Sequence, residues 1–194
     1  MMKMSNCAGA RRGQDGATLI EVLVSLVILM LGLLGLVGVM IQSQRSQVES
    51  YQRVQALLLV QDMAARLNAN KAVATCYTLA GFLGTGNTTV PAAAACAVGT
   101  ADQKARVTSD LTEWRDLLLG SAELLGGDQV GAVLAARGCI SRNASDLYQV
   151  SIAWQGGGAT AAPPAGVPCA TGQYGADDAA RRAVSVTVQL GNLS

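Results

Sequence analysis

Apolar residues are concentrated in one uninterrupted run near the start of the chain. From Ile20 to Ile41 the sequence reads IEVLVSLVILMLGLLGLVGVMI, and Glu21 is its one charged residue. At a rise of about 1.5 Å per residue, a helix of this length crosses the hydrocarbon core of a bilayer. The alternative is a buried core helix, but such helices are rarely this long and this uniformly apolar. The pattern therefore predicts a transmembrane helix over about 20–41.

After this run, apolar residues recur at three- and four-residue spacing, which is typical of an amphipathic helix. Arg53, Asp62 and Arg66 lie off this stripe, and no Pro or Gly interrupts the chain before Gly81. We therefore expect one long helix over 17–70, whose second half packs its apolar face on a domain formed by 71–194. The stripe consists of Val48, Tyr51, Val54, Leu58, Met63 and Leu67.

The rest of the chain predicts a small α+β domain. A helical pattern runs from about Asp102 to Leu125 and ends at Gly126-Gly127, with Trp114 as a core anchor. Three candidate strands follow, over 131–142, 147–155 and 183–190. The last two alternate cleanly between apolar and polar residues, as half-buried antiparallel strands do. A long Gly- and Pro-rich loop joins them.

Composition and charge exclude several classes of function. The chain has 194 residues, 51% of them hydrophobic, with a net charge of +1, so disorder is not indicated. Because 14 Lys and Arg balance 13 Asp and Glu, we expect no direct binding of nucleic acid. The absence of His removes His-based catalysis and most zinc sites. The acidic pair Asp177-Asp178 is too small to predict calcium. We expect no catalytic residue, metal or cofactor.

The segment before the apolar run is short and basic. Residues 1–16 contain Lys3, Arg11 and Arg12 against Asp15. Such a flank stays in the cytoplasm, so the bulk of the chain is expected outside the inner membrane. A secretory signal peptide begins in the same way, but no small-residue cleavage site of the A-x-A kind follows the apolar run.

A carboxylate at the membrane end of a helix calls for a reason, since charge in hydrocarbon is expensive. In the simplest interpretation, Glu21 is solvated at the interface. In the second, it meets a positive charge. If the chain is cut after Gly16, the new α-amino group of Ala17 lies four residues away on the same helical face. The amine of a neighbouring subunit could also meet it.

The cysteines indicate an oxidising compartment. Cys7 would be lost with the segment 1–16, which leaves an even number, Cys76, Cys96, Cys139 and Cys169. Three pairings are possible, and local closure favours Cys76–Cys96 and Cys139–Cys169. Each such loop would contribute about 3 kcal/mol in the chain-entropy model. The second bridge would tie the long loop back against the first strand.

The start of the chain resembles a known signal. Residues 16–22, Gly-Ala-Thr-Leu-Ile-Glu-Val, are similar to the class III signal sequence of type IV pilins, G|FTLIEV. Residues 23–26 and 32–36 look like the PilV family of minor pilins, also called type IV pilus modification proteins. The resemblance covers about the first 50 residues. It implies that a prepilin peptidase cleaves after Gly16 and methylates the amine of Ala17, where pilins usually have Phe or Met.

The resemblance also implies a fold, a role and partners. It implies a pilin-like fold and a structural subunit, not an enzyme, with Thr18 and Glu21 serving subunit assembly. The chain would sit in the inner membrane with residues 71–194 as a periplasmic head. It would then enter a pilus on the cell surface. Its partners would be other minor pilins, the major pilin and the inner-membrane assembly platform, and the resemblance also allows a large tip adhesin as a partner. It would help prime assembly at or near the fibre tip.

Two alternatives stay open. A minor pseudopilin of a type II secretion system shares the same signal and the same assembly physics. A membrane-tethered periplasmic enzyme or binding protein would require a convergent polar pocket in the head. Gly32, Gly35 and Gly38 either permit close helix approach and local melting or are merely tolerated by lipid.

Overall fold

The computed structural model describes Gly16 and residues 18–121, 124–125, 128–129, 133–175 and 177–191. The chain divides into two compact units, residues 1–44 and 45–194. The first helix, α1 (Leu19–Ala69), contributes residues to both units. Each unit is described by itself.

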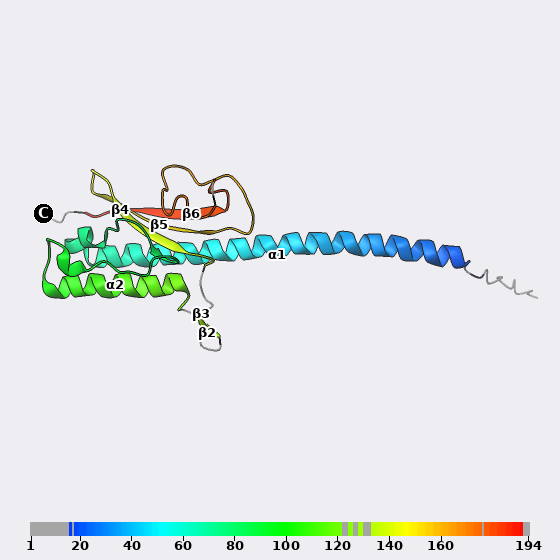
Figure 1. The fold of residues 1–194 in the computed structure, drawn as a ribbon, viewed down its shortest axis with the longest axis horizontal. Coiled ribbons are helices and arrows are strands. Elements are labelled where there is room, and N and C mark those ends of the chain that lie inside the picture. Colours follow the sequence, from blue (N-terminus) through cyan, green and yellow to red (C-terminus); the bar gives the residue numbers. More distant parts are fainter. Residues whose placement is uncertain are drawn as a thin grey trace, which may run out of the picture. The chain divides into compact units, whose positions relative to one another are not determined.

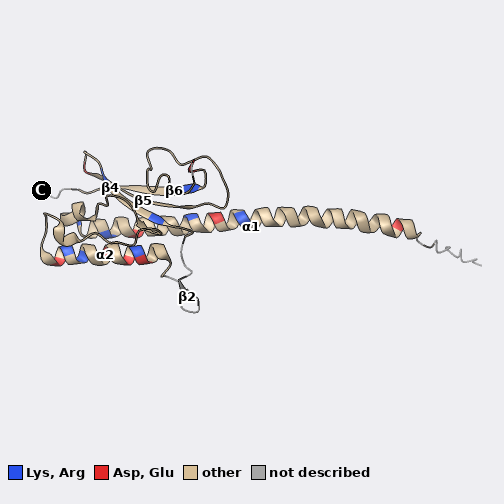
Figure 2. Cartoon of the chain, viewed as in Figure 1, with Lys and Arg blue, Asp and Glu red and all other residues tan. Residues whose placement is uncertain are grey.

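In the first unit, α1 is a regular helix whose apolar side chains are all exposed. Figure 2 shows no charged residue on it between Glu21 and Arg45. Along the whole of α1, Glu21 lies in the first turn and Arg66 in the last. Each charge therefore interacts favourably with the partial charge of the helix dipole at its end. The observed bounds lie within two residues of the predicted 17–70.

The second unit holds the remaining elements (Figure 1). The elements are η1 (Lys71–Tyr77), β1 (Leu83–Gly84), η2 (Ala93–Ala95), α2 (Ala101–Leu119), β2 (Leu124–Leu125), β3 (Asp128–Gln129), β4 (Arg137–Arg142), β5 (Leu147–Gln155) and β6 (Arg181–Gln189). Helical segments and short strands alternate before β4, and the two longest strands, β5 and β6, come last.

Side-chain and backbone signals at both ends set the length of α2. Thr100 and Gln103 form a capping box that satisfies the first backbone N–H groups. Gly120 adopts a left-handed conformation (φ 99°) and its N–H closes the last turn. The predicted end at Leu125 was therefore wrong by six residues, because Gly120, and not Gly126-Gly127, terminates the helix.

The main sheet has the strand order β1-β4-β5-β6, and all of its pairs are antiparallel. The prediction for β5 was correct at both ends, and β6 begins two residues earlier than predicted. The first predicted strand, 131–142, was too long. Val133–Ala136 form a turn in which Ala135 has a positive φ of 52°, so β4 starts only at Arg137. Residues 131–132 lie outside the described residues.

Helices and the sheet share one core, which confirms the α+β prediction. The inner face of the sheet, including Ile140 and Ile152, packs with Met63 of α1 and Trp114 of α2. All four side chains are fully buried, and Trp114 is a core anchor as predicted. Its indole N–H also donates to the Leu59 carbonyl oxygen at 2.9 Å.

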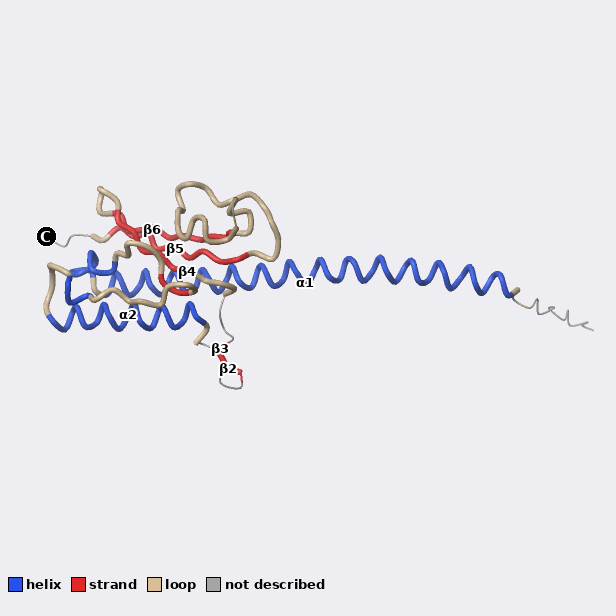
Figure 3. The backbone as a smooth tube through the Cα atoms, in the orientation of Figure 1, coloured by secondary structure: helices blue, strands red, loops and turns tan. Residues whose placement is uncertain are grey.

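The outer face of the sheet is covered by the loop that joins β5 to β6, drawn as a tan tube in Figure 3. Cys169, Ala170 and Tyr174 of this loop pack on Ala153 of β5 in a second, smaller core. The predicted long loop is therefore present, and it folds back as a layer of the head. The sheet lies between helices on one side and this loop on the other.

The prediction of the buried face of α1 was partly wrong. Of the predicted stripe, only Met63 and Leu67 are buried, and the head packs instead on the face that carries Ala56, Val60 and Ala64. Residues two positions apart on a helix point about 200° apart. The four residues of the predicted stripe that precede Met63 therefore lie away from the buried face of α1. We call them the outer stripe: Val48, Tyr51, Val54 and Leu58, which are 57%, 57%, 55% and 59% exposed.

Candidate functional site

The start of α1 brings two of the predicted site residues together. Thr18 stands just before the helix, and its carbonyl oxygen accepts the N–H of Glu21 at 3.0 Å and of Val22 at 3.2 Å. The Thr18 hydroxyl lies 3.4 Å from the same Glu21 N–H. Thr18 therefore acts as the N-cap, and Glu21 sits three residues later in the first turn. Gly16 is exposed, and Ala17 lies outside the described residues.

The helix that follows meets the requirements of a membrane span. Among the described residues, α1 is the one helix long and apolar enough to cross a bilayer, and none of its apolar window is buried within the protein. A Cβ atom at Gly32, Gly35 or Gly38 would meet no atom within 4 Å. Within one chain, these glycines therefore make no close contact, and a packing role for them needs a second helix.

The outer stripe extends exposed apolar surface onto the second unit. Its residues follow three- and four-residue spacing over Val48–Leu58, which is about 15 Å of helix. Beyond Leu58 the same face becomes polar at Gln61 and Asp62. Over the outer stripe, α1 therefore has exposed apolar residues on the side away from the head.

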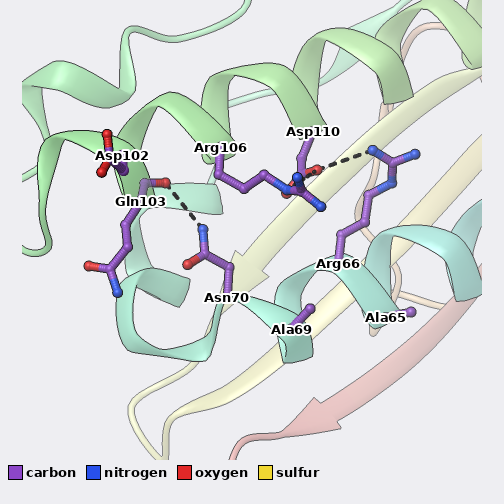
Figure 4. A pocket seen from close by; sticks show the side chains of 8 residues that line it. All are labelled: Ala65, Arg66, Ala69, Asn70, Asp102, Gln103, Arg106 and Asp110. Atoms are coloured by element: carbon purple, nitrogen blue, oxygen red, sulfur yellow. Dashed lines mark hydrogen bonds and ion pairs between the residues drawn. The ribbon is translucent and has the colours of Figure 1, made fainter.

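A polar cluster lies at the far end of α1, beside an open pocket of about 550 Å³ that residues of both α1 and α2 line (Figure 4). Arg66 Nη1 donates to Asp110 at 3.2 Å and to Glu113 at 2.6 Å, and Arg66 Nε donates to Asp62 at 2.9 Å. Arg106 adds a longer ion pair with Asp110, 3.5 Å. Sequence reasoning missed this cluster, although the i, i+4 spacing of Asp62 and Arg66 was a visible signal.

The hydrogen bonds and ion pairs of this cluster shift the pKa values of two of its residues, Tyr77 and Glu113. Burial and the hydrogen bond that Tyr77 donates to Asp110, 2.5 Å long, raise the pKa of Tyr77 above its ordinary value. Hydrogen bonds from Arg66 and Ser109 lower the pKa of the Glu113 carboxyl. These residues therefore tie α1, η1 and α2 together.

Two disulfides hold the head. Cys76 is bonded to Cys96, with Cα atoms 5.6 Å apart, and Cys139 to Cys169, with Cα atoms 5.7 Å apart. The first closes the segment between η1 and η2. The second fixes the β5–β6 loop to β4.

Aromatic stacking adds to the attachment of the β5–β6 loop. The Arg137 guanidinium carbon lies 4.7 Å from the centroid of the Tyr174 ring and 5.2 Å from that of Phe82. The Tyr174 hydroxyl is 2.8 Å from the Ala135 carbonyl oxygen and 2.9 Å from that of Ala153. Burial raises the pKa of Tyr174. No local sequence pattern predicted this contact of Arg137 with the two aromatic rings.

A buried ion pair completes the loop. Arg181 Nε donates to Asp178 at 3.1 Å, and the two side chains are 4% and 10% exposed. Arg181 Nη1 also donates to the carbonyl oxygens of Val167 (2.8 Å) and Cys169 (3.2 Å). The Asp178 carboxylate accepts the Gly172 N–H at 2.9 Å. Asp178 is thus committed to protein donors, and the described residues contain no group of three possible metal ligands.

Comparison with known families is consistent with the N-terminal geometry. Residues 11–37 match the family model described as Prokaryotic N-terminal methylation motif. This match supports a pilin-type chain with a class III signal peptide, such as a type IV pilin or a pseudopilin, and such chains are structural subunits. No curated protein and no solved structure matches the chain.

Proposed function

We propose that this chain is a minor pilin of the PilV type, a structural subunit of a type IV pilus. The observation that carries the proposal is the segment from Gly16 to Glu21, which lies inside the matched motif and is followed by the uncharged stretch of α1 over 22–44. Residues 23–26 and 32–36 support PilV within the pilins. The first unit anchors the chain in the inner membrane, and the disulfide-bonded head faces the periplasm.

A prepilin peptidase cleaves after Gly16 and methylates the new amine at Ala17. The assembly platform then moves the apolar helix out of lipid and into contact with other subunits, both minor pilins and the major pilin. In the fibre, Glu21 pairs with the α-amine of an adjacent subunit, which mainly sets register because desolvation offsets much of the Coulomb energy. The subunit helps prime assembly and stays at or near the tip, where it can support a large adhesin.

The outer stripe supports an assembled rather than a solitary state. Four apolar side chains on the second unit are more than half exposed and lie on one helical face. Monomeric proteins seldom leave such a contiguous stripe without a partner. A neighbouring apolar helix in a fibre would cover it, and the polar residues beyond Leu58 would mark where that contact ends.

The test is the intact mass of the protein from sheared surface fibres and from inner membranes. We expect a mature chain that begins at Ala17 and carries one methyl group in the fibres. A Gly16→Val variant should remain uncut and absent from fibres. A Gly13→Val variant, with the same substitution three residues earlier in the leader, should be processed normally.

The same masses separate the alternatives. A mature chain confined to membranes and never found in fibres would favour a minor pseudopilin of a type II secretion system. An uncut chain in both fractions would refute the pilin proposal and leave a membrane-tethered periplasmic protein.

A further inference from the structure

Two surface segments of the head carry a modification motif that the assembly role does not use. Asn87-Thr88-Thr89 and Asn143-Ala144-Ser145 both fit the pattern Asn-x-Ser/Thr, the acceptor for N-linked glycosylation. A third match, 192–194, lies outside the described residues. The motif is short, so the geometry of each asparagine decides whether it can react.

Asn143 lies at the tip of the hairpin between β4 and β5. All residues from 141 to 146 are exposed. Its Oδ1 accepts the backbone N–H of Ser145 at 3.0 Å and of Leu147 at 2.9 Å. These two donors identify Oδ1 as the acceptor, so Nδ2 points elsewhere, and it has no hydrogen-bond partner among the described residues. The reactive nitrogen and the Ser145 hydroxyl are thus both available to solvent.

Asn87 has the same motif in a different environment. Its Oδ1 accepts the Thr89 N–H at 3.2 Å, but its Nδ2 donates to the Phe82 carbonyl oxygen at 2.8 Å. The side chain is partly buried, and its backbone pairs with Gly84. A transferase would have to break the Phe82 contact before it could reach the nitrogen. The chain therefore contains a built-in comparison between an open and an occupied acceptor.

We propose that Asn143 is an N-glycosylation site and that Asn87 is not. The donor is an oligosaccharide linked through a pyrophosphate to a polyprenyl lipid. Asn143 Nδ2 attacks C1 of the first sugar, the bond between C1 and the pyrophosphate oxygen breaks, and the lipid pyrophosphate leaves. The transferase takes up the proton that Nδ2 loses. The inference rests on the proposed function in one respect, since the head must be exported to meet the lipid-linked donor.

The experiment is peptide mass mapping of the full-length protein purified from the cells that make it. After reduction of the disulfides, cleavage after Arg142 and Arg181 gives a peptide, 143–181, in which Asn143 is the one asparagine. Cleavage after Lys71 and Lys104 gives a peptide, 72–104, in which Asn87 is the one asparagine. We expect glycan mass on the first peptide and the unmodified mass for the second.

Two matched variants test the assignment. Ser145→Ala removes the hydroxyl but keeps the backbone N–H that holds Asn143, so the turn survives and the added mass should disappear. Thr89→Ala removes the equivalent hydroxyl at the occupied site and should leave the glycan pattern unchanged. An unmodified 143–181 peptide, added mass that persists in Ser145→Ala, or glycan on Asn87 instead would each overturn the proposal. The N-terminus read from the same sample reports separately on the pilin proposal.

Discussion

Replacing Asp178 by Asn tests whether the buried ion pair holds the β5–β6 loop. Asn keeps an oxygen for the Gly172 N–H and tolerates the positive φ of 53° at this position, so the main loss is the charge. Arg181, 4% exposed, is then left as a buried cation without its anion. Removing one partner of a buried pair costs about 3–5 kcal/mol. For a unit of this size, we expect a Tm lower by roughly 6–20 °C.

The assay is thermal unfolding of the full chain in detergent micelles, followed by tryptophan fluorescence. Both tryptophans, Trp114 and Trp154, are buried in the head, so the signal reports on that unit. Asp177→Asn is the matched control, because this neighbouring carboxylate is exposed and should change stability by less than about 0.5 kcal/mol. Equal, small effects of both substitutions would refute the reasoning.

A double variant separates loss of the pair from loss of packing. Arg181→Met together with Asp178→Asn removes both charges and leaves no buried ion. We expect it to be more stable than Asp178→Asn alone, because the cost lies mainly in the uncompensated charge. The single variant Arg181→Met is measured as well. If the destabilisation of the double variant equals the sum of those of Asp178→Asn and Arg181→Met, the two residues act independently.

Three further outcomes follow from the same structure. Replacing Cys139 and Cys169 together by Ser should lower the free energy of unfolding by about 3 kcal/mol, measured in the same assay against the unreduced parent chain; an unchanged Tm would contradict this. Folding raises the pKa of three buried tyrosines, so the folded state holds these protons more tightly than the unfolded state. Their contribution to stability should be constant below pH 10, the ordinary tyrosine value, and should fall as pH rises above it, which unfolding midpoints across alkaline pH would show. These tyrosines are Tyr77, Tyr148 and Tyr174. Val54→Glu in the outer stripe should prevent incorporation into fibres without changing head stability by more than about 0.5 kcal/mol, whereas Gln61→Glu on the same helix should enter fibres; equal amounts of both in sheared fibres would count against the stripe as a contact.

Periodicity carried most of the fold prediction. The bounds of α1 and β5 could be read from apolar spacing, because each element buries residues at its own repeat. The start of β4 could not be read, because a left-handed Ala135 makes a turn that no Gly or Pro signals. The end of α2 depended on which glycine after Leu119 terminates the helix.

The predictable part of the candidate site was its N-terminal motif, where the chemistry is contiguous in sequence. Gly16, Thr18 and Glu21 lie within six residues of each other. The polar cluster around Asp110 and the stack around Arg137 join residues far apart in the chain, so local patterns revealed at most the i, i+4 pair of Asp62 and Arg66. The buried face of α1 was misassigned because both faces carry apolar residues, and only the packing of the head distinguishes them.

The manner in which the β5–β6 loop is attached has a consequence for sequence tolerance. A disulfide, an ion pair and an aromatic stack hold its second half, from Val167 to Arg181. The stretch Ala161–Ala165 takes part in none of these and is mostly exposed. Residues can therefore be exchanged or inserted there while every anchor stays in place. The head gains a site where an epitope tag or a fluorophore can be added, and where the surface can diversify without cost to the fold.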